Sequence, residues 1–181
     1  MAHVTLVDPA SADASVKPTL DQINGAFGVL PNMFKAVANS PAALVSMWGA
    51  FGALGGGKLG ARLGEEIAVA VANANACEYC LAAHTALGKK AGASGDEMAD
   101  AQVGRSADPR TQAALTFALK VVRDRAAVTQ SDVAALKAAG FDDEGVVEII
   151  AHVALNLFTN YVNVALDVPV DFPGVRLKQA A

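Results

Sequence analysis

The chain has 181 residues, which is long enough for one domain with a substantial hydrophobic core. Hydrophobic residues make up 53% of it and charged residues only 18%, so we expect part of the apolar surface to be covered in a homo-oligomer. The net charge of −4 and the scattered lysines and arginines argue against nucleic acid as a partner. No basic region followed by an apolar run opens the chain, so we expect a cytoplasmic protein without a secretory signal.

Apolar residues recur at helical spacing along most of the chain, and no strand pattern competes with them. We therefore expect an all-α fold of six to eight helices. Residues 1–15 are expected to form a loose arm in which His3 is solvated. Residues 16–173 are expected to form a single helical domain, and residues 174–181 a tail. The expected helical segments, in chain order, are 16–27, a short one from Pro31, 41–54, 65–76, one from Cys77, 96–102, and those starting at Asp108, Thr129 and Asp142, the last reaching about Leu166.

The uncharged stretch Ala36–Gly57 is about long enough to span a bilayer. It contains Asn39, Ser40 and Pro41 and five glycines, which suit a soluble helix with loops. We therefore expect no membrane association.

The most informative stretch is Gly64–Gly92, which holds both cysteines of the chain. Cys77, Cys80 and His84 form a C-x-x-C-x-x-x-H array. Positions i, i+3 and i+7 of a helix share one face, so a helix starting near Cys77 would place two sulfurs and an imidazole on one wall. The N-terminus of that helix would also stabilise a thiolate.

Three interpretations of the cysteines are open. A structural zinc site usually needs four ligands, and the chain offers only Cys77, Cys80, His84 and Glu65 for a partial one. The cysteines could also be buried as small hydrophobic residues. A redox dithiol is favoured, because this spacing at a helix start permits a disulfide.

A family resemblance carries the argument further. Glu65, twelve positions before Cys77, followed by C-E-Y-C-L-A-A-H, resembles the core motif of the AhpD-like alkylhydroperoxidases, which are grouped with the carboxymuconolactone decarboxylases. The flanking segments GVLPNMFKAVANSPAAL and LNLFTNYVNVALDVPVDFP are similar to those of the peroxidase-related branch, so the resemblance runs from about Gly25 to Pro173. One residue departs from the pattern. The residue before the second cysteine is Tyr79 in this chain, whereas the best-known members carry a histidine there.

The resemblance implies an AhpD-like helical bundle and a peroxidase that reduces alkyl hydroperoxides or hydrogen peroxide. In this scheme Cys80 reacts with the peroxide, and Cys77 then forms a disulfide with the oxidised Cys80. His84 accepts the thiol proton, and Glu65 orients the imidazole. From the residues alone the order of the two cysteines stays open, since the helix start favours ionising Cys77 and the nearby histidine favours Cys80.

The resemblance also suggests partners. A lipoyl-bearing or thioredoxin-like dithiol protein would reduce the disulfide, and the assembly would be a trimer or hexamer, with a dimer also compatible. No cofactor and no metal are implied. The competing functions are lactone decarboxylation, which has no use for a dithiol, and a non-enzymatic oligomeric scaffold or metal-binding module with structural cysteines.

The last predicted helix carries a row of neutral polar residues, His152, Asn156, Asn160 and Asn163, at spacings of four, four and three. Such a row is expected to meet partner groups, a subunit interface or a pocket. For His152 a structural hydrogen bond is favoured over a role in the site. Together with Tyr79, His152 and Asn156 are nevertheless candidate site-lining residues.

A weak internal repeat is also visible. Residues 66–83 and 148–165 share six of eighteen positions, including Tyr79 with Tyr161, which is compatible with an old duplication. The second copy has neither cysteine nor His84, so we expect chemistry only in the first half of the chain.

Overall fold

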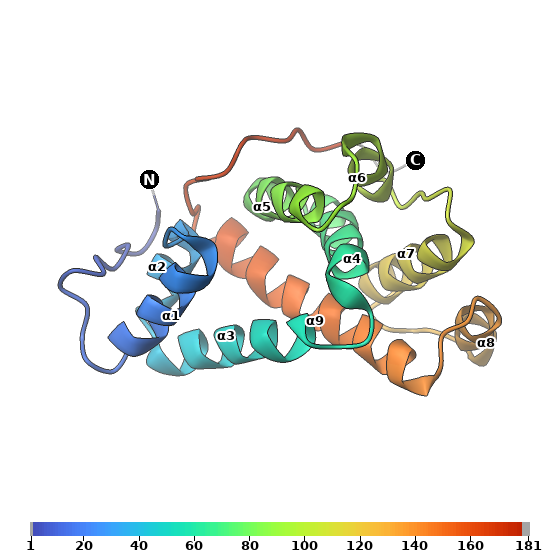
Figure 1. Cartoon of the computed structure of the whole chain (residues 1–181), viewed down its shortest axis with the longest axis horizontal. Coiled ribbons are helices and arrows are strands. Elements are labelled where there is room, and N and C mark those ends of the chain that lie inside the picture. Colours follow the sequence, from blue (N-terminus) through green and yellow to red (C-terminus); the bar gives the residue numbers. More distant parts are fainter. Residues whose placement is uncertain (1, 179–181) are drawn as a thin grey trace.

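The computed structural model describes residues 2–178. Within them every regular element is a helix, so the all-α prediction is confirmed. The helices, shown in Figure 1, are α1 (Lys17–Phe27), α2 (Asn32–Val37), α3 (Pro41–Gly55), α4 (Gly60–Ala74), α5 (Glu78–Lys90), α6 (Gly95–Ala101), α7 (Pro109–Arg123), α8 (Gln130–Ala138) and α9 (Asp143–Ala165).

These described residues contain nine helices, so the predicted number of six to eight is too low. Each corresponds to one of the nine segments expected in chain order, and a break separates α4 from α5. Between them Ala76 adopts a left-handed backbone conformation with φ of 54°, and the N–H of Cys77 donates to the carbonyl of Ala72 at 2.9 Å. The chain therefore turns sharply just before the cysteines. The aligned repeat 148–165 has no such break, because it lies within the single helix α9.

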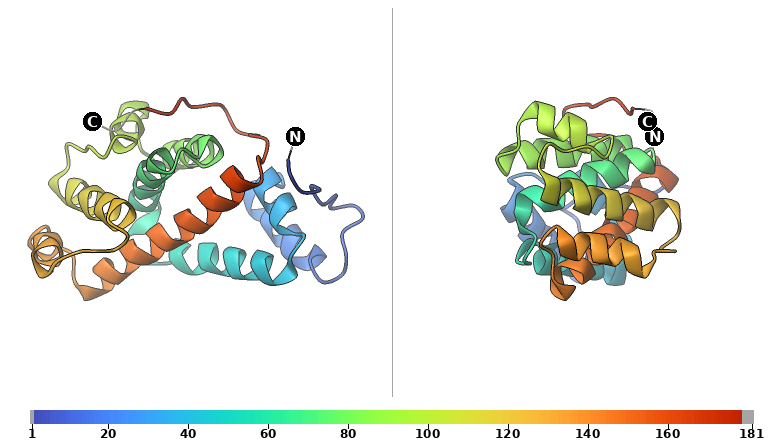
Figure 2. Two further views of the ribbon diagram at one scale, coloured as in Figure 1. Left: turned by 180° about the vertical axis from the view of Figure 1, so that it is seen from behind. Right: turned by 90° about the vertical axis from the view of Figure 1, so that its right-hand side faces the viewer.

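Helix α9 is the central element of the fold. It packs against α3, α4, α5 and α7, and Figures 1 and 2 show it crossing the molecule diagonally. Its inner face buries Ile149 and Val153. Within the described residues it is the one helix long and apolar enough to cross a membrane by length and composition, and these core contacts account for its apolar inner face.

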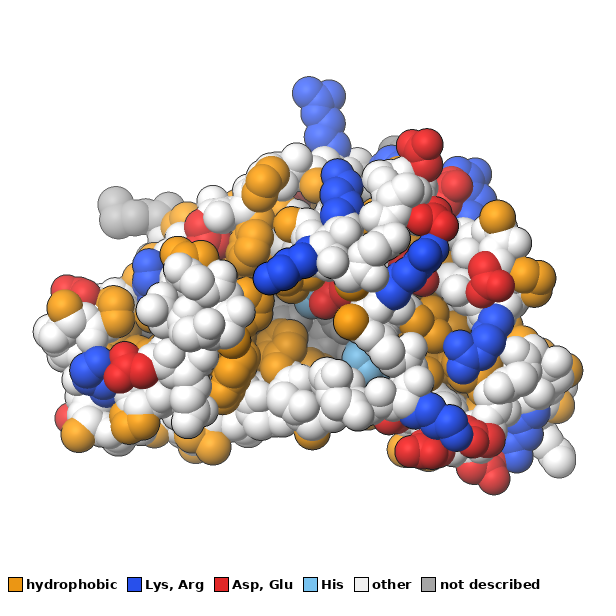
Figure 3. Space-filling model, in the orientation of Figure 1, with side chains coloured by type: hydrophobic (Ala, Val, Ile, Leu, Met, Phe, Trp, Pro, Cys, Tyr) orange, Lys and Arg blue, Asp and Glu red, His pale blue; other side chains and the backbone are white. Residues whose placement is uncertain are grey.

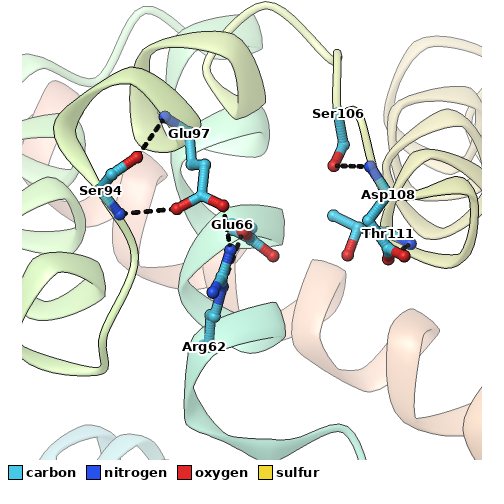
Figure 4. Close-up of polar contacts among 7 residues, drawn as sticks. All are labelled: Arg62, Glu66, Ser94, Glu97, Ser106, Asp108 and Thr111. Atoms are coloured by element: carbon cyan, nitrogen blue, oxygen red, sulfur yellow. Dashed lines mark hydrogen bonds and ion pairs between the residues drawn. The ribbon is translucent and has the colours of Figure 1, made fainter.

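Charged and capping residues fix the ends of the helices around α4. Arg62 of α4 contacts Glu66 at 3.3 Å and Glu97 of α6 at 2.5 Å, and Glu97 also closes a capping box with Ser94 (Figure 4). Asp108 caps α7 by accepting from the N–H of Thr111, as Figure 4 also shows. Glu66 is therefore part of the structural ion pairs, whereas its neighbour Glu65 takes no part in them.

The segments outside the helices are held by specific contacts. The N–H of His3 donates to the carbonyl of Leu166 at 2.7 Å, and its Nδ1 lies 3.0 Å from the carbonyl of Ala165. His3 is exposed, but it contacts the end of α9, which differs from the loose arm expected from the sequence. A segment without helical periodicity gives no local sign of such distant contacts.

The segment after α9 runs over α5 toward α6, as Figure 1 shows. Buried Gln102 donates to the carbonyl of Arg176, and Asn73 accepts from the N–H of Lys178. The last part of the predicted tail, residues 179–181, lies outside the described residues.

Candidate active site

The two cysteines sit at the start of α5. Cys77 is the N-cap residue, with an extended backbone, and its Sγ accepts a hydrogen bond from the N–H of Cys80 at 3.2 Å. Both cysteines are free and buried. The prediction that the helix starts near Cys77 is confirmed. Cys80 and His84 line one cavity, and Cys77, at the N-cap, is not among the residues that line it.

Cys80 lies in surroundings that favour its thiolate. Burial raises the pKa of its thiol, but the hydrogen bond with Cys77, the charge of His84 and the amide of Asn163 together lower the pKa to about 6. The Asn163 Nδ2 donates to the Cys80 Sγ at 3.2 Å. The pKa of Cys77 is raised, because its thiol donates to Cys80 and is itself buried. The pair therefore divides into one thiolate, Cys80, and one thiol, Cys77.

His84 and Glu65 form a direct pair across the two helices. The Nδ1 of His84 lies 2.7 Å from Oε2 of Glu65, and both side chains are largely buried. Burial lowers the pKa of His84, but the charge and hydrogen bond of Glu65 outweigh it, so the net pKa is raised. With Nδ1 held by the carboxylate, Nε2 is the ring atom left to exchange a proton.

Tyr79 is turned toward α2 and the C-terminal segment. Its hydroxyl accepts from the N–H of Met33 at 3.2 Å, and its ring packs edge-on against Phe172 with centroids 5.8 Å apart. Burial raises the pKa of the phenol, which therefore stays neutral. These contacts hold the Tyr79 side chain between α2 and the C-terminal segment.

The polar row on α9 faces the interior. Asn156, Asn160 and Asn163 are buried; Asn160 accepts from Asn75 at 2.9 Å, and Asn163 reaches Cys80. The structural hydrogen bond favoured for His152 is absent among the described residues, where its buried Nε2 has no partner. Its ring instead lies against Gly64, at which a Cβ would come within 3.0 Å of Cε1. The three asparagines of the row therefore face the interior of the chain, beside the site.

Two adjoining cavities open beside these groups. The first, here called the Cys80 cavity, measures about 30 Å³ and is mainly aromatic. Its lining includes Cys80, His84, Phe34, Phe51, Tyr79 and Phe172. The second, here called the chamber, measures about 230 Å³ and is bordered by Glu65, His84, Gly64, His152, Asn156 and Leu54. Figure 3 shows the hollow on this face, with hydrophobic, histidine and acidic side chains around it.

Cys77 faces elsewhere. It adjoins a groove of about 270 Å³ that Glu78, Val164, Val170 and Leu177 also line. Within residues 2–178 no three histidine, cysteine, aspartate or glutamate side chains are arranged to hold a metal ion. The partial zinc site considered from the sequence is therefore not assembled here.

Comparisons with known proteins identify relatives of this fold. Residues 40–124, from the start of α3 into the turn after α7, match the carboxymuconolactone decarboxylase family. A peroxidase-related protein from Ralstonia eutropha JMP134, described as an alkylhydroperoxidase AhpD core, superimposes with a TM-score of 0.81 at 26% identity, over 94% of this chain and 92% of that one. The family resemblance is confirmed, and the fold is AhpD-like.

Two further AhpD-like neighbours were found. An uncharacterized peroxidase-related protein from Silicibacter sp. TM1040 has a TM-score of 0.82 at 24% identity, over 93% of this chain and 91% of that one. The debrominase Bmp8, in complex with 2,3,4-tribromopyrrole, has a TM-score of 0.79 at 22% identity, over 94% of each chain. At these identities both show the fold alone. No curated protein matches the chain.

Sequence reasoning missed the contact of Asn163 with Cys80. The spacings of four, four and three residues indicated that Asn163 shares a helix face with His152 and Asn156, but not which helix that face contacts. The contact depends on the packing of α9 against α5, which no local pattern encodes.

Proposed function

We propose that this protein is a thiol peroxidase that reduces organic hydroperoxides through a Cys77–Cys80 dithiol cycle. The observation that carries the proposal is the Cys80 side chain, a thiolate near neutral pH that lines an apolar cavity together with His84. The thiolate is the form of cysteine that attacks peroxides, and an ordinary thiol near pKa 8.5 is only a few per cent ionised at pH 7.

Residues of the site can carry out each step of peroxide reduction and disulfide formation. The Cys80 thiolate attacks the terminal oxygen of the hydroperoxide, the O–O bond breaks, and the alkoxide takes a proton from the His84 imidazolium to leave as an alcohol. Cys80 is then a sulfenic acid. Cys77 attacks its sulfur and gives up its thiol proton, and the hydroxyl group leaves as water, which forms the Cys77–Cys80 disulfide. Glu65 holds the imidazole throughout and stabilises its cation.

The difference in pKa between the two cysteines determines which sulfur of the disulfide the reductant attacks. An incoming thiolate that attacks Cys77 expels Cys80, which is the better leaving group because its thiol has the lower pKa. Cys77 lines the groove and Cys80 lines the cavity, with Tyr79 in both linings, so the reductant and the peroxide reach different sulfurs from different openings. A lipoyl-bearing or thioredoxin-like dithiol protein supplies the two electrons.

A peroxide-consumption assay with a dithiol donor tests this proposal. The wild type should turn over tert-butyl hydroperoxide when dihydrolipoamide or reduced thioredoxin is supplied. Cys80→Ser should be inert. In the absence of the donor, Cys77→Ser should consume one equivalent and retain a sulfenic acid on Cys80. An active Cys80→Ser variant beside an inert Cys77→Ser variant would reverse the roles of the cysteines, and a wild type that consumes no peroxide would contradict the proposal.

A second candidate is reductive dehalogenation of an aromatic ring, which the four phenylalanines of the Cys80 cavity favour: Phe27, Phe34, Phe51 and Phe172. Here Cys80 would take the halogen as a cation equivalent, the ring carbon would gain a proton, and Cys77 would release halide by forming the disulfide. Bromide release from 2,3,4-tribromopyrrole by the reduced protein, equal to the disulfide formed, would identify this activity.

The remaining alternatives have less support. A carboxylated lactone would need a cationic partner, and no lysine or arginine within the described chain lines the Cys80 cavity or the chamber. A structural scaffold would give no reason for the low pKa of the Cys80 thiol.

A further inference from the structure

The chamber is the larger of the two cavities at the site and has a mixed lining. Phe27, Phe51 and Leu54 supply one apolar wall from α1 and α3, and Glu65 and His84 face it from α4 and α5. The Cys80 cavity adjoins it, since Phe27, Phe51, His84 and Leu87 line both. The smaller cavity, about 30 Å³, has room for on the order of two water-sized groups. The body of any larger substrate must therefore lie in the chamber.

The charged groups at the chamber are unsuited to an anion. Glu65 is an acceptor-only carboxylate, and its one cationic partner, His84, is already paired with it. When His84 is protonated, its charge is already neutralised by Glu65, so a carboxylate or phosphate on the ligand would find no free cation. When His84 is neutral, the ligand anion would lie beside the negatively charged Glu65. Like charges brought together in a desolvated site are strongly unfavourable.

The basic side chains nearest in sequence to the chamber residues of α4 are already paired with carboxylates. Lys58, just before α4, contacts Asp142 and Glu144. Arg62, on the first turn of α4, is held by Glu66 and Glu97, as Figure 4 shows. Neither side chain is among the residues that line the chamber.

The start of α4 is likewise unavailable to an anion, although a helix N-terminus normally attracts one. The chain fills this position with its own carboxylate: Glu148 accepts from the N–H of Lys58 at 2.8 Å and from the N–H of Leu59 at 2.9 Å. Lys58, Arg62 and the start of α4 are therefore satisfied internally. His152 also lines the chamber with an unpartnered Nε2, but burial lowers its pKa and so disfavours the imidazolium that would attract an anion.

We propose that the chamber binds the body of a neutral, predominantly apolar organic molecule and discriminates against substrates that carry a carboxylate or phosphate. This inference rests on the proposed function for the reacting group, a hydroperoxide that reaches Cys80, but the ligand class follows from the chamber itself. Phe27, Phe51 and Leu54 receive the hydrocarbon, while Glu65 and His84 face the side from which the reacting end enters.

Binding of unreactive alcohols tests the ligand class without requiring any activity. The probes are 2-phenyl-2-propanol, the alcohol from cumene hydroperoxide, and its para-carboxylate analogue, titrated calorimetrically into the reduced protein. The neutral alcohol should bind at least about tenfold more tightly than the carboxylate. Equal affinities, or tighter binding of the carboxylate, would overturn the inference, and so would no detectable binding of the neutral alcohol.

Two chamber variants locate the binding. Gly55→Leu should weaken binding of the neutral alcohol, because a Cβ at Gly55 meets nothing within 4 Å and the longer side chain would occupy chamber space. Ala61→Arg should raise affinity for the carboxylate about tenfold by adding the missing cation. Ser46→Arg, on the exposed side of α3, is the matched control and should leave both affinities unchanged. If Ser46→Arg acts like Ala61→Arg, the effect is not local and the inference fails.

Kinetics separate this inference from the proposed function. With cumene hydroperoxide and its para-carboxylate analogue as substrates, the neutral compound should have a kcat/KM at least about tenfold higher. If the neutral alcohol binds but neither hydroperoxide reacts, the ligand class stands and the peroxidase proposal fails. If both hydroperoxides react equally, the peroxidase proposal stands and the discrimination inferred for the chamber is wrong.

Discussion

At the scale of single residues, the imidazole of His84 is the group on which the reactivity of Cys80 most depends. Its charge helps to hold the pKa of the thiol at about 6, so the wild-type reaction rate should fall as the pH drops through that value and the thiolate becomes protonated. In His84→Gln the pKa should move back toward the ordinary range of a buried thiol, and the rate at pH 7 should fall by about 10²–10⁴-fold.

Stopped-flow oxidation of each protein across pH 5–10 provides the measurement. Raising the pH should recover much of the loss in His84→Gln, because hydroxide then ionises the thiol. Glu65→Gln should show a smaller defect of the same kind, since it removes the orienting carboxylate and leaves the base. A His84→Gln protein with the wild-type rate and pH profile would mean that the histidine is only structural.

Asn163 is the second residue that we expect to set the thiol pKa. Its Nδ2 donates to the Cys80 sulfur, and a hydrogen bond to an anion is among the stronger ones in proteins. Asn163→Leu should therefore raise the pKa of Cys80 by about one unit, which the pH dependence of iodoacetamide alkylation would measure. Tyr161→Phe, on the exposed face of the same helix, is the control. An unchanged pKa in Asn163→Leu would show that this contact does not stabilise the thiolate.

Substitution of Tyr79, in contrast, should affect stability more than reactivity. Its hydroxyl is engaged with the N–H of Met33, so Tyr79→Phe should lower the free energy of unfolding by about 1 kcal/mol and change peroxide reactivity less than threefold. Urea unfolding and the stopped-flow assay measure the two effects. A large loss of reactivity with unchanged stability would instead assign the phenol to the proton relay, in place of the histidine that the best-known family members carry.

At the scale of elements, helix starts were predictable and helix packing was not. Asp108 with Pro109, and Thr129 with Asp132, are local signals, because a capping side chain bonds to a backbone N–H within three residues of itself. The start of α5 near Cys77 had no such signal, and was only the condition for placing Cys77, Cys80 and His84 on one face. The inward orientation of the α9 row depends on contacts with α4 and α5 that are far away in sequence. The spacing alone therefore left open whether the row meets partner groups, a subunit interface or a pocket.

The opposite face of α9 is the better candidate for self-association. Val147, Ile150, Tyr161 and Val164 are 40–65% exposed, and with Ala154 and Leu157 they repeat at spacings of three and four, as in helix–helix seams. No charged residue lies between Glu148 and Asp167. A solvated helix face is normally polar or charged, so we expect a second copy of the chain to cover this stripe.

Light scattering at micromolar concentration tests this expectation. The wild type should be a homo-oligomer, with a trimer, hexamer or dimer all compatible with the family resemblance. Ile150→Glu should shift it toward the monomer, because a charge on the seam would be desolvated. Val45→Glu, at an exposed position on α3, should have no effect. A stable wild-type monomer, or equal dissociation by both variants, would contradict this role of α9.

At the scale of the whole molecule, the fold brings together groups that lie far apart in the chain. Glu65 comes from α4, Cys80 and His84 from α5, and Asn163 from α9. The family resemblance predicted the pairing of Glu65 with His84, whereas the spacing alone left the return of the chain undetermined. The turn at Ala76 reverses the chain and makes that contact possible, and the packing of α9 then adds an amide that no motif indicated.

The central claim is that Cys80 and Cys77 act as one redox pair, and intact-mass analysis after a single addition of peroxide tests it most directly. One equivalent of tert-butyl hydroperoxide added to the fully reduced protein at pH 7 should give a product lighter by two hydrogens, with the disulfide mapped by proteolysis to the peptide containing Cys77 and Cys80. An unchanged mass, or a gain of oxygen atoms on either cysteine without a disulfide, would contradict the account.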